Sequence, residues 1–91
     1  MSDSYKQSQK HKEELERCLF LLLQQKLNEV EVIMHRLVAR LHLVEWRDDA
    51  LVIYRDIILA EEYISVAEFS KALKEIYAKT VELIFKIERT E

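Results

Sequence analysis

FLLLQQKLNEVEVIMHRLVARLHLV, residues 20–44, is the stretch of sequence that decides the fold. Its large apolar residues recur at alternating steps of three and four, a spacing that places them on one face of a helix. No glycine or proline interrupts the stretch. We therefore predict one long helix over residues 13–46 that carries a helix-packing or dimer seam. The seam consists of Phe20, Leu23, Leu27, Val30, Met34, Leu37, Leu41 and Val44.

A β-strand is the competing interpretation of the same stretch, because its valines and isoleucines are also common in strands. A half-buried strand would alternate apolar and polar residues. The adjacent pairs Leu37–Val38 and Leu43–Val44 break that alternation, since they would put apolar side chains on both faces. Apolar residues that flank the seam widen it beyond the stripe of a two-stranded coiled coil. We therefore predict an all-α protein in which the long helix has more than one helical neighbour.

A second helix is predicted over residues 49–62. Asp48 and Asp49 could supply its N-cap, because a carboxylate accepts backbone N–H bonds at that position. The segment is apolar nearly all round, and Arg55, Asp56 and Glu62 mark its solvent-exposed side. Its apolar residues are Leu51, Val52, Ile53, Tyr54, Ile57, Ile58 and Leu59. This pattern is typical of a helix that packs between others.

A third helix is predicted over residues 65–89. Ser65 and Glu68 have the spacing of a capping box, and Ile64 stands where a hydrophobic staple begins. The helix then has its own apolar series, which runs from Val66 to Ile87 at steps of three and four. The second and third helices are thus expected to form a hairpin beside the long helix.

The domain organisation predicted from these patterns is a flexible polar lead-in, residues 1–12, and a single helical-bundle domain, residues 13–91. A chain of 91 residues has a thin core. A helix over residues 13–46 would be about 50 Å long and would extend past its own hairpin. We therefore expect a second copy to cover the overhang, so that a homodimer completes the bundle.

The composition excludes several classes of function. Zero Gly removes the glycine-rich phosphate loops and the nucleophile elbow of the hydrolases. The single cysteine, Cys18, excludes an internal disulfide and suits a reducing compartment. The apolar run from Cys18 to Leu23 is too short to cross a bilayer. We expect a cytoplasmic protein with no membrane contact, no cofactor and no enzymatic activity.

Four residues that could bind a metal share one face of the predicted long helix. They are Glu31, His35, His42 and Glu45. His35 and His42 would stand about 10 Å apart along the helix, too far to share one ion. We interpret the four as a solvated polar face. A metal-binding bundle or a small helical enzyme is the second alternative.

A stripe of arginines offers a nucleic-acid alternative. Arg36, Arg40 and Arg47 lie roughly opposite the seam, where guanidinium groups could contact phosphates. The third helix could also enter a groove of DNA. The net charge of −3 argues against a broad nucleic-acid surface. A nucleic-acid-binding regulator is therefore the first alternative.

The function predicted first is non-catalytic: a regulator or adaptor that binds another protein of unknown identity. A phage- or plasmid-type inhibitor, an anti-factor and a small chaperone are examples of this class. Trp46 and Tyr63 stand near the ends of predicted helices and are the candidate partner anchors, because aromatic side chains concentrate binding energy at interfaces. Trp46 is equally well interpreted as a residue that closes the end of the predicted long helix.

Overall fold

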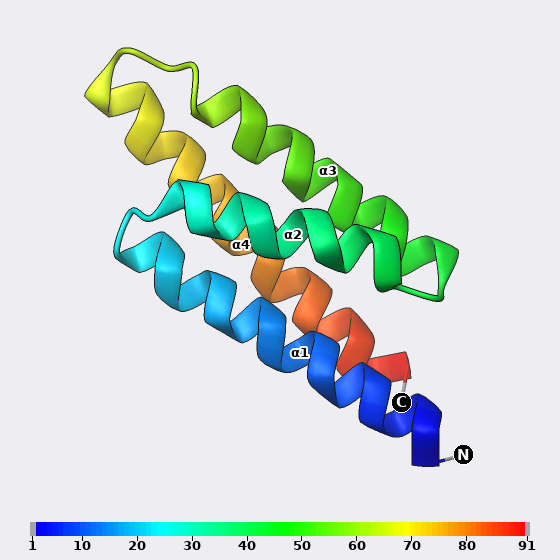
Figure 1. Cartoon of the computed structure of the whole chain (residues 1–91). Coiled ribbons are helices and arrows are strands. Elements are labelled where there is room, and N and C mark those ends of the chain that lie inside the picture. Colours follow the sequence, from blue (N-terminus) through cyan, green and yellow to red (C-terminus); the bar gives the residue numbers. More distant parts are fainter. Residues whose placement is uncertain (1, 91) are drawn as a thin grey trace.

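The chain folds as an antiparallel four-helix bundle. The computed structural model describes the backbone of residues 2–90 and the side chains of residues 7–90. Its helices are α1 (Ser2–Leu23), α2 (Leu27–Arg40), α3 (Val44–Ala60) and α4 (Val66–Thr90). Each helix packs against two others in a ring, with α1 and α3 both lying between α2 and α4 (Figure 1). The all-α class is confirmed, and the described chain has no strand. The predicted count of three helices is wrong.

The predicted long helix is broken first after Leu23. Gln25 adopts a left-handed conformation, with φ of 60°. The N–H of Lys26 donates to the carbonyl of Leu21 at 2.9 Å, and the N–H of Gln25 donates to the carbonyl of Leu22 at 3.0 Å. These two bonds form a Schellman motif, which ends a helix and usually places glycine in the left-handed position. The lack of glycine in the sequence therefore did not prevent a helix stop.

The second break lies between α2 and α3. Leu41 is extended, with φ of −67° and ψ of 125°. The side chain of Arg47 donates to the Leu41 carbonyl from Nε at 3.3 Å and from Nη2 at 3.0 Å, and so satisfies the end of α2. The new helix begins at Val44, earlier than predicted. Asp49 is therefore not an N-cap, and it pairs instead with Lys86 of α4 at 2.8 Å.

The predicted seam is correct in its middle and wrong at its ends. Its buried members all belong to α2 or its C-cap: Leu27, Val30, Met34, Leu37 and Leu41. Phe20, Leu23 and Val44 are 66%, 70% and 62% exposed. The turns at Gln25 and Leu41 rotate the chain, so each neighbouring helix buries a different face. On α1 that face carries Leu15, Cys18 and Leu22.

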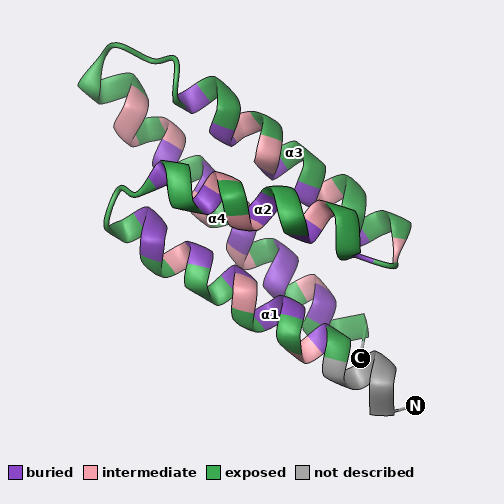
Figure 2. Ribbon diagram, in the orientation of Figure 1, coloured by how far each residue is buried: buried purple, intermediate pink, exposed green. Residues whose placement is uncertain are grey.

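The other two helices contribute similar series to the core, which Figure 2 shows as the inward-facing purple stripe. The α3 series is Trp46, Ala50, Ile53, Ile57 and Ala60. The α4 series is Leu73, Ile76, Thr80, Leu83 and Ile87, within the series predicted for the third helix. The Thr80 hydroxyl donates to the Ile76 carbonyl at 2.8 Å, which satisfies it inside the core.

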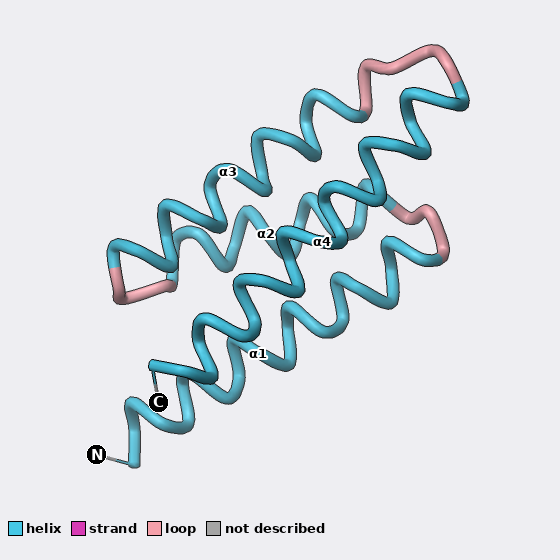
Figure 3. Tube along the Cα trace, turned by 180° about the vertical axis from the view of Figure 1, so that it is seen from behind, coloured by secondary structure: helices cyan, strands magenta, loops and turns pink. Residues whose placement is uncertain are grey.

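From Ser8 onward, α1 packs in the bundle. Ser8, His11 and Lys12 are buried, so the packed domain begins before the predicted boundary at residue 13. Met1 lies outside the described residues. Both ends of the chain lie at one end of the bundle, together with the α2–α3 connection (Figure 3). The α1–α2 and α3–α4 turns lie at the opposite end.

Candidate functional site

The most exposed apolar side chains lie on the turn between α3 and α4. We call residues 61–68 the hairpin tip, and every residue in it is exposed. Ile64 is 98% exposed and Val66 is 80% exposed, while Tyr63 is exposed to a smaller extent. The tip extends past the α1–α2 turn, so neither α1 nor α2 covers it (Figures 1 and 3). The chain thus presents a projecting apolar surface.

Local backbone geometry holds the hairpin tip in this arrangement. The N–H of Glu68 donates to Oγ of Ser65 at 3.5 Å, so the Ser65 side chain caps α4 as predicted. The N–H of Phe69 donates to the Ser65 carbonyl at 3.0 Å. The predicted hydrophobic staple is wrong, because an Ile64 side chain that is almost fully exposed cannot pack on α4. The capped turn therefore directs Ile64 away from the bundle.

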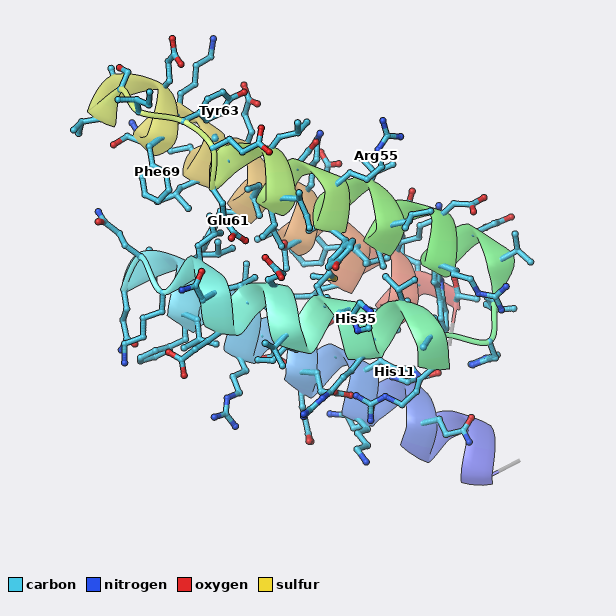
Figure 4. The ribbon with its side chains drawn as sticks, turned by 45° about the horizontal axis from the view of Figure 1, so that its top comes forward. His11, His35, Arg55, Glu61, Tyr63 and Phe69 are labelled. Carbon is cyan, nitrogen blue, oxygen red and sulfur yellow. The ribbon has the colours of Figure 1, made fainter. Side chains whose placement is uncertain are left out.

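Carboxylates surround the apolar part of the hairpin tip. Glu61, Glu62 and Glu68 belong to the tip itself, and Glu31 of α2 lies beside it. A hydrogen bond with the Glu31 carboxyl, assisted by burial and by the charge of Glu31, raises the pKa of Glu61 to about 7. Figure 4 shows Glu61 directed toward α2, while Tyr63 lies farther out on the tip. The surface combines apolar side chains with negative charge.

Two grooves open at the same end of the bundle as the hairpin tip, and the first of them borders the tip itself. The first has a volume of about 480 Å³ and separates the tip from the α1–α2 turn, with Leu27, Glu61 and Phe69 in its walls. The second has a volume of about 430 Å³ and runs between α1 and α4, with Leu23 and Tyr77 in its walls.

Trp46 is part of the core and not a surface anchor. It is 2% exposed, and its ring meets the ring of His42 edge-on at a centroid distance of 5.2 Å. His42 in turn lies 6.4 Å from the ring of His11. The prediction of a partner anchor at Trp46 is wrong, because α3 begins before Trp46 and turns the indole inward. Tyr63, the other predicted anchor, lies on the exposed hairpin tip.

His11 and Glu14 complete a buried polar group beside Trp46. His11 Nδ1 and Glu14 Oε1 are 3.8 Å apart, longer than a hydrogen bond. Burial lowers the pKa of His11, with further lowering by His42 and Arg40 and a partly opposing effect of Glu14. Arg40 of α2 reaches Glu14 of α1 with Nη2 at 2.5 Å from Oε2. This group joins α1 to the α2–α3 connection.

The predicted arginine stripe is divided between structural roles. Arg40 donates to Glu14 and also to the carbonyl of Arg36 at 3.3 Å. Arg47 donates to Leu41 from two nitrogens, as described above. Arg36 is exposed and lines a groove between α1 and α2 together with Glu14. The guanidinium groups of Arg40 and Arg47 therefore stabilise the bundle. The third, that of Arg36, lies in a groove that also contains the carboxylates of Glu14 and Glu29.

The four candidate metal ligands do not share one helix face. Glu31 and His35 belong to α2, His42 lies in the α2–α3 connection, and Glu45 begins α3. Among the side chains of residues 7–90, no group of three or more histidine, cysteine or acidic residues is placed to hold a metal ion. The break after α2 separates the residues that a continuous helix would have aligned.

Cys18 is a buried member of the α1 core face. Burial, assisted by Glu14, raises the pKa of its thiol to about 12. The thiol is therefore protonated at neutral pH and is not a nucleophile. None of the described helices combines the length and the apolar character needed to cross a bilayer.

Ile64 and Val66 are the surface residues that sequence reasoning did not select. Ile64 was assigned to a staple and Val66 to the apolar series of the third helix, both of which are packing roles. The available signal was their place close to Tyr63, at the predicted junction of the second and third helices. The chain has no significant match among protein-family models, curated proteins or solved structures.

Proposed function

We propose that this chain is a non-catalytic adaptor or regulator that binds another protein through the hairpin tip. The observation that carries the proposal is the exposure of Ile64 and Val66, two large apolar side chains on a projecting turn. Exposed apolar patches of this kind mark interaction sites on soluble proteins. An inhibitor, an anti-factor and a small chaperone would each work in this way.

The chemistry of the hairpin tip describes its partner. Apolar side chains favour an apolar segment, and Glu61, Glu62 and Glu68 favour a segment that also carries lysine or arginine. A second copy of the tip would meet this surface with like charge. The partner expected at the tip is therefore a different protein, with a basic and apolar segment.

Affinity capture from the native host with matched variants tests the proposal. The tip variant is Ile64→Asp, and the control is Phe20→Asp, which changes an exposed apolar residue on α1 in the same way. We expect the unmodified chain and the control to capture a common protein that the tip variant does not capture. Added salt should weaken that capture, because opposite charges contribute to it.

The proposal would be contradicted if the tip variant captured the same proteins as the control with equal yield. Circular dichroism of both variants checks that the bundle is folded, so loss of capture reports on the surface itself. Direct titration of the identified protein with the purified chain would then show whether binding needs any further component.

We also propose that the chain forms a homodimer, but for a different reason from the one that the sequence suggested. The long overhanging helix that suggested a dimer does not exist, because α1 and α2 fold back on each other. α3, which contains most of the second predicted helix, nevertheless carries exposed apolar side chains on its outer side. α3 packs only against α2 and α4, so this outer side is available to a second copy.

A further inference from the structure

The outer face of α3 carries alternating apolar and charged residues at steps of four and three. The residues are Val44, Asp48, Leu51, Arg55 and Ile58. The three apolar ones are exposed, and Figure 4 shows Arg55 directed away from the bundle. The face is distinct from the hairpin tip, because it runs along the middle of the helix.

Asp48 and Arg55, the two charged residues of this face, differ from the neighbouring aspartates of α3 in their partners. Asp49 pairs with Lys86 at 2.8 Å and Asp56 pairs with Lys79 at 2.5 Å, so both neighbouring aspartates join α3 to α4. Among the described residues, neither Asp48 nor Arg55 forms an ion pair. Two opposite charges thus lie one on each side of Leu51, on an exposed apolar face.

A two-fold axis makes such a face complementary to itself. In an antiparallel pair of helices, an axis near Leu51 and Val52 brings each Asp48 opposite the Arg55 of the other copy. This axis lies at the middle of α3 (Val44–Ala60), so the two helices overlap along their whole length. Every exposed apolar residue of α3 then falls within the overlap.

Other positions of the axis fit less well. An axis at Arg55 would place the two Arg55 side chains together and would set Asp48 against Glu62 of the other copy. An axis between Ile58 and Leu59 would pair Arg55 with Glu62, but the helices would overlap only near their C-terminal ends. The complementary charges and the full overlap coincide only at the middle of the helix.

We propose that a second copy of the chain docks on the outer face of α3, with two reciprocal Asp48–Arg55 ion pairs about a two-fold axis near Leu51. This inference rests on the homodimer in the proposed function. Val52 and Leu59 lie beside the face and extend the contact toward α4, where Phe85 is also exposed. One helix face is smaller than the standard interface of about 800 Å² per partner, so dissociation is expected at micromolar concentrations.

Sedimentation equilibrium over a wide concentration range tests this arrangement with a charge-swap series. The variants are Asp48→Arg, Arg55→Asp and the double variant Asp48→Arg/Arg55→Asp. The control is Glu62→Arg, which makes the same change of charge beyond the end of α3. We expect the unmodified chain and the control to dimerise equally. Each single variant should dimerise at least about tenfold more weakly, and the double variant should recover the dimer.

A monomer at every concentration would overturn the arrangement, and so would single variants that dimerise like the unmodified chain. A double variant that is weaker than both single variants would also contradict the pairing. Because all these side chains are exposed, circular dichroism should show the same helix content throughout. Capture of a partner by the hairpin tip is measured with different variants, so failure of the dimer leaves that test independent.

Discussion

The two ends of the bundle use their residues in opposite ways. At the closed end, where α2 passes into α3, Trp46 and His11 are buried and Arg47 satisfies the end of α2. At the other end, the hairpin tip leaves Ile64 and Val66 exposed. The aromatic and charged residues that look functional in the sequence therefore close the fold. The aliphatic residues Ile64 and Val66, which look structural in the sequence, form the surface that we propose binds a partner.

The largest expected difference between the ends is in stability. Trp46→Ala should lower the free energy of unfolding by about 3–5 kcal/mol, because it leaves a large cavity in the core. Ile64→Ala should change it by less than about 0.5 kcal/mol, because the side chain is already in water. Urea denaturation of both variants measures the contrast. Equal losses would show that the tip packs on the bundle.

Arg47→Ala should have an intermediate effect. It removes both hydrogen bonds to the Leu41 carbonyl and leaves the last turn of α2 less well satisfied. We expect a loss of about 1 kcal/mol in the free energy of unfolding. Arg36→Ala is the matched control, because that arginine side chain is exposed on α2, the helix whose end Arg47 satisfies. A loss as large in the control would remove the special role of Arg47.

At the hairpin-tip end, the pH dependence of the stability should be set by the Glu31–Glu61 pair. Because the pKa of Glu61 rises from 4.5 to about 7, the folded state binds more protons than the unfolded state between these values. Stability should therefore fall as the pH rises from about 4.5 to about 7. Glu31→Gln removes the shared proton and should flatten this fall, which urea midpoints at several pH values would show. An unchanged pH profile would mean that the pair does not form.

At the closed end, the contribution of His11 to stability should change with pH in the opposite direction. This should be the smallest of the expected effects. The folded-state pKa of His11 lies below its ordinary value of 6.5, so the unfolded state takes up the proton first as the pH falls. This contribution to stability is present above pH 6.5 and is lost as the pH falls toward the folded-state pKa. His11→Asn should reduce the loss, while His35→Asn, which changes an exposed ring, should not. Equal profiles for both variants would contradict the role of burial.

Much of the fold could be predicted from residue spacing. The α2 part of the seam and the α4 series were correct, because an apolar step of three or four residues has the same meaning in any packed helix. The Ser65 cap was also correct. Local signals of this kind act within one turn of a helix and do not depend on the rest of the chain.

The two helix breaks were missed in the sequence analysis, because the apolar series of neighbouring helices were treated as one continuous series across each turn. The core series of α1 ends at Leu22 and that of α2 begins at Leu27, five residues later; the step from Leu41 to Trp46 is also five. Phe20 and Leu23, and later Val44, bridge these steps with the expected spacing but lie outside the core. Gln25 adopts a left-handed conformation that usually favours glycine, so its residue type gives no signal of the helix stop.

The candidate site was the least predictable part. Whether Ile64 is buried depends on the relative lengths of the two helical hairpins, since only the longer one projects. That property depends on both breaks, so an error in the first helix carries through to the surface. The same error aligned Glu31 with His42 on one face and placed Trp46 outside the core.

Fluorescence quenching by acrylamide tests the contrast between the two ends most directly. The chain has one tryptophan, Trp46, so the unmodified protein reports on the closed end and the variant Trp46→Phe/Ile64→Trp reports on the hairpin tip. The buried indole at position 46 should be weakly quenched and should emit at short wavelength, whereas an indole at position 64 should be strongly quenched. Equal quenching at the two positions, or stronger quenching at position 46, would contradict the account.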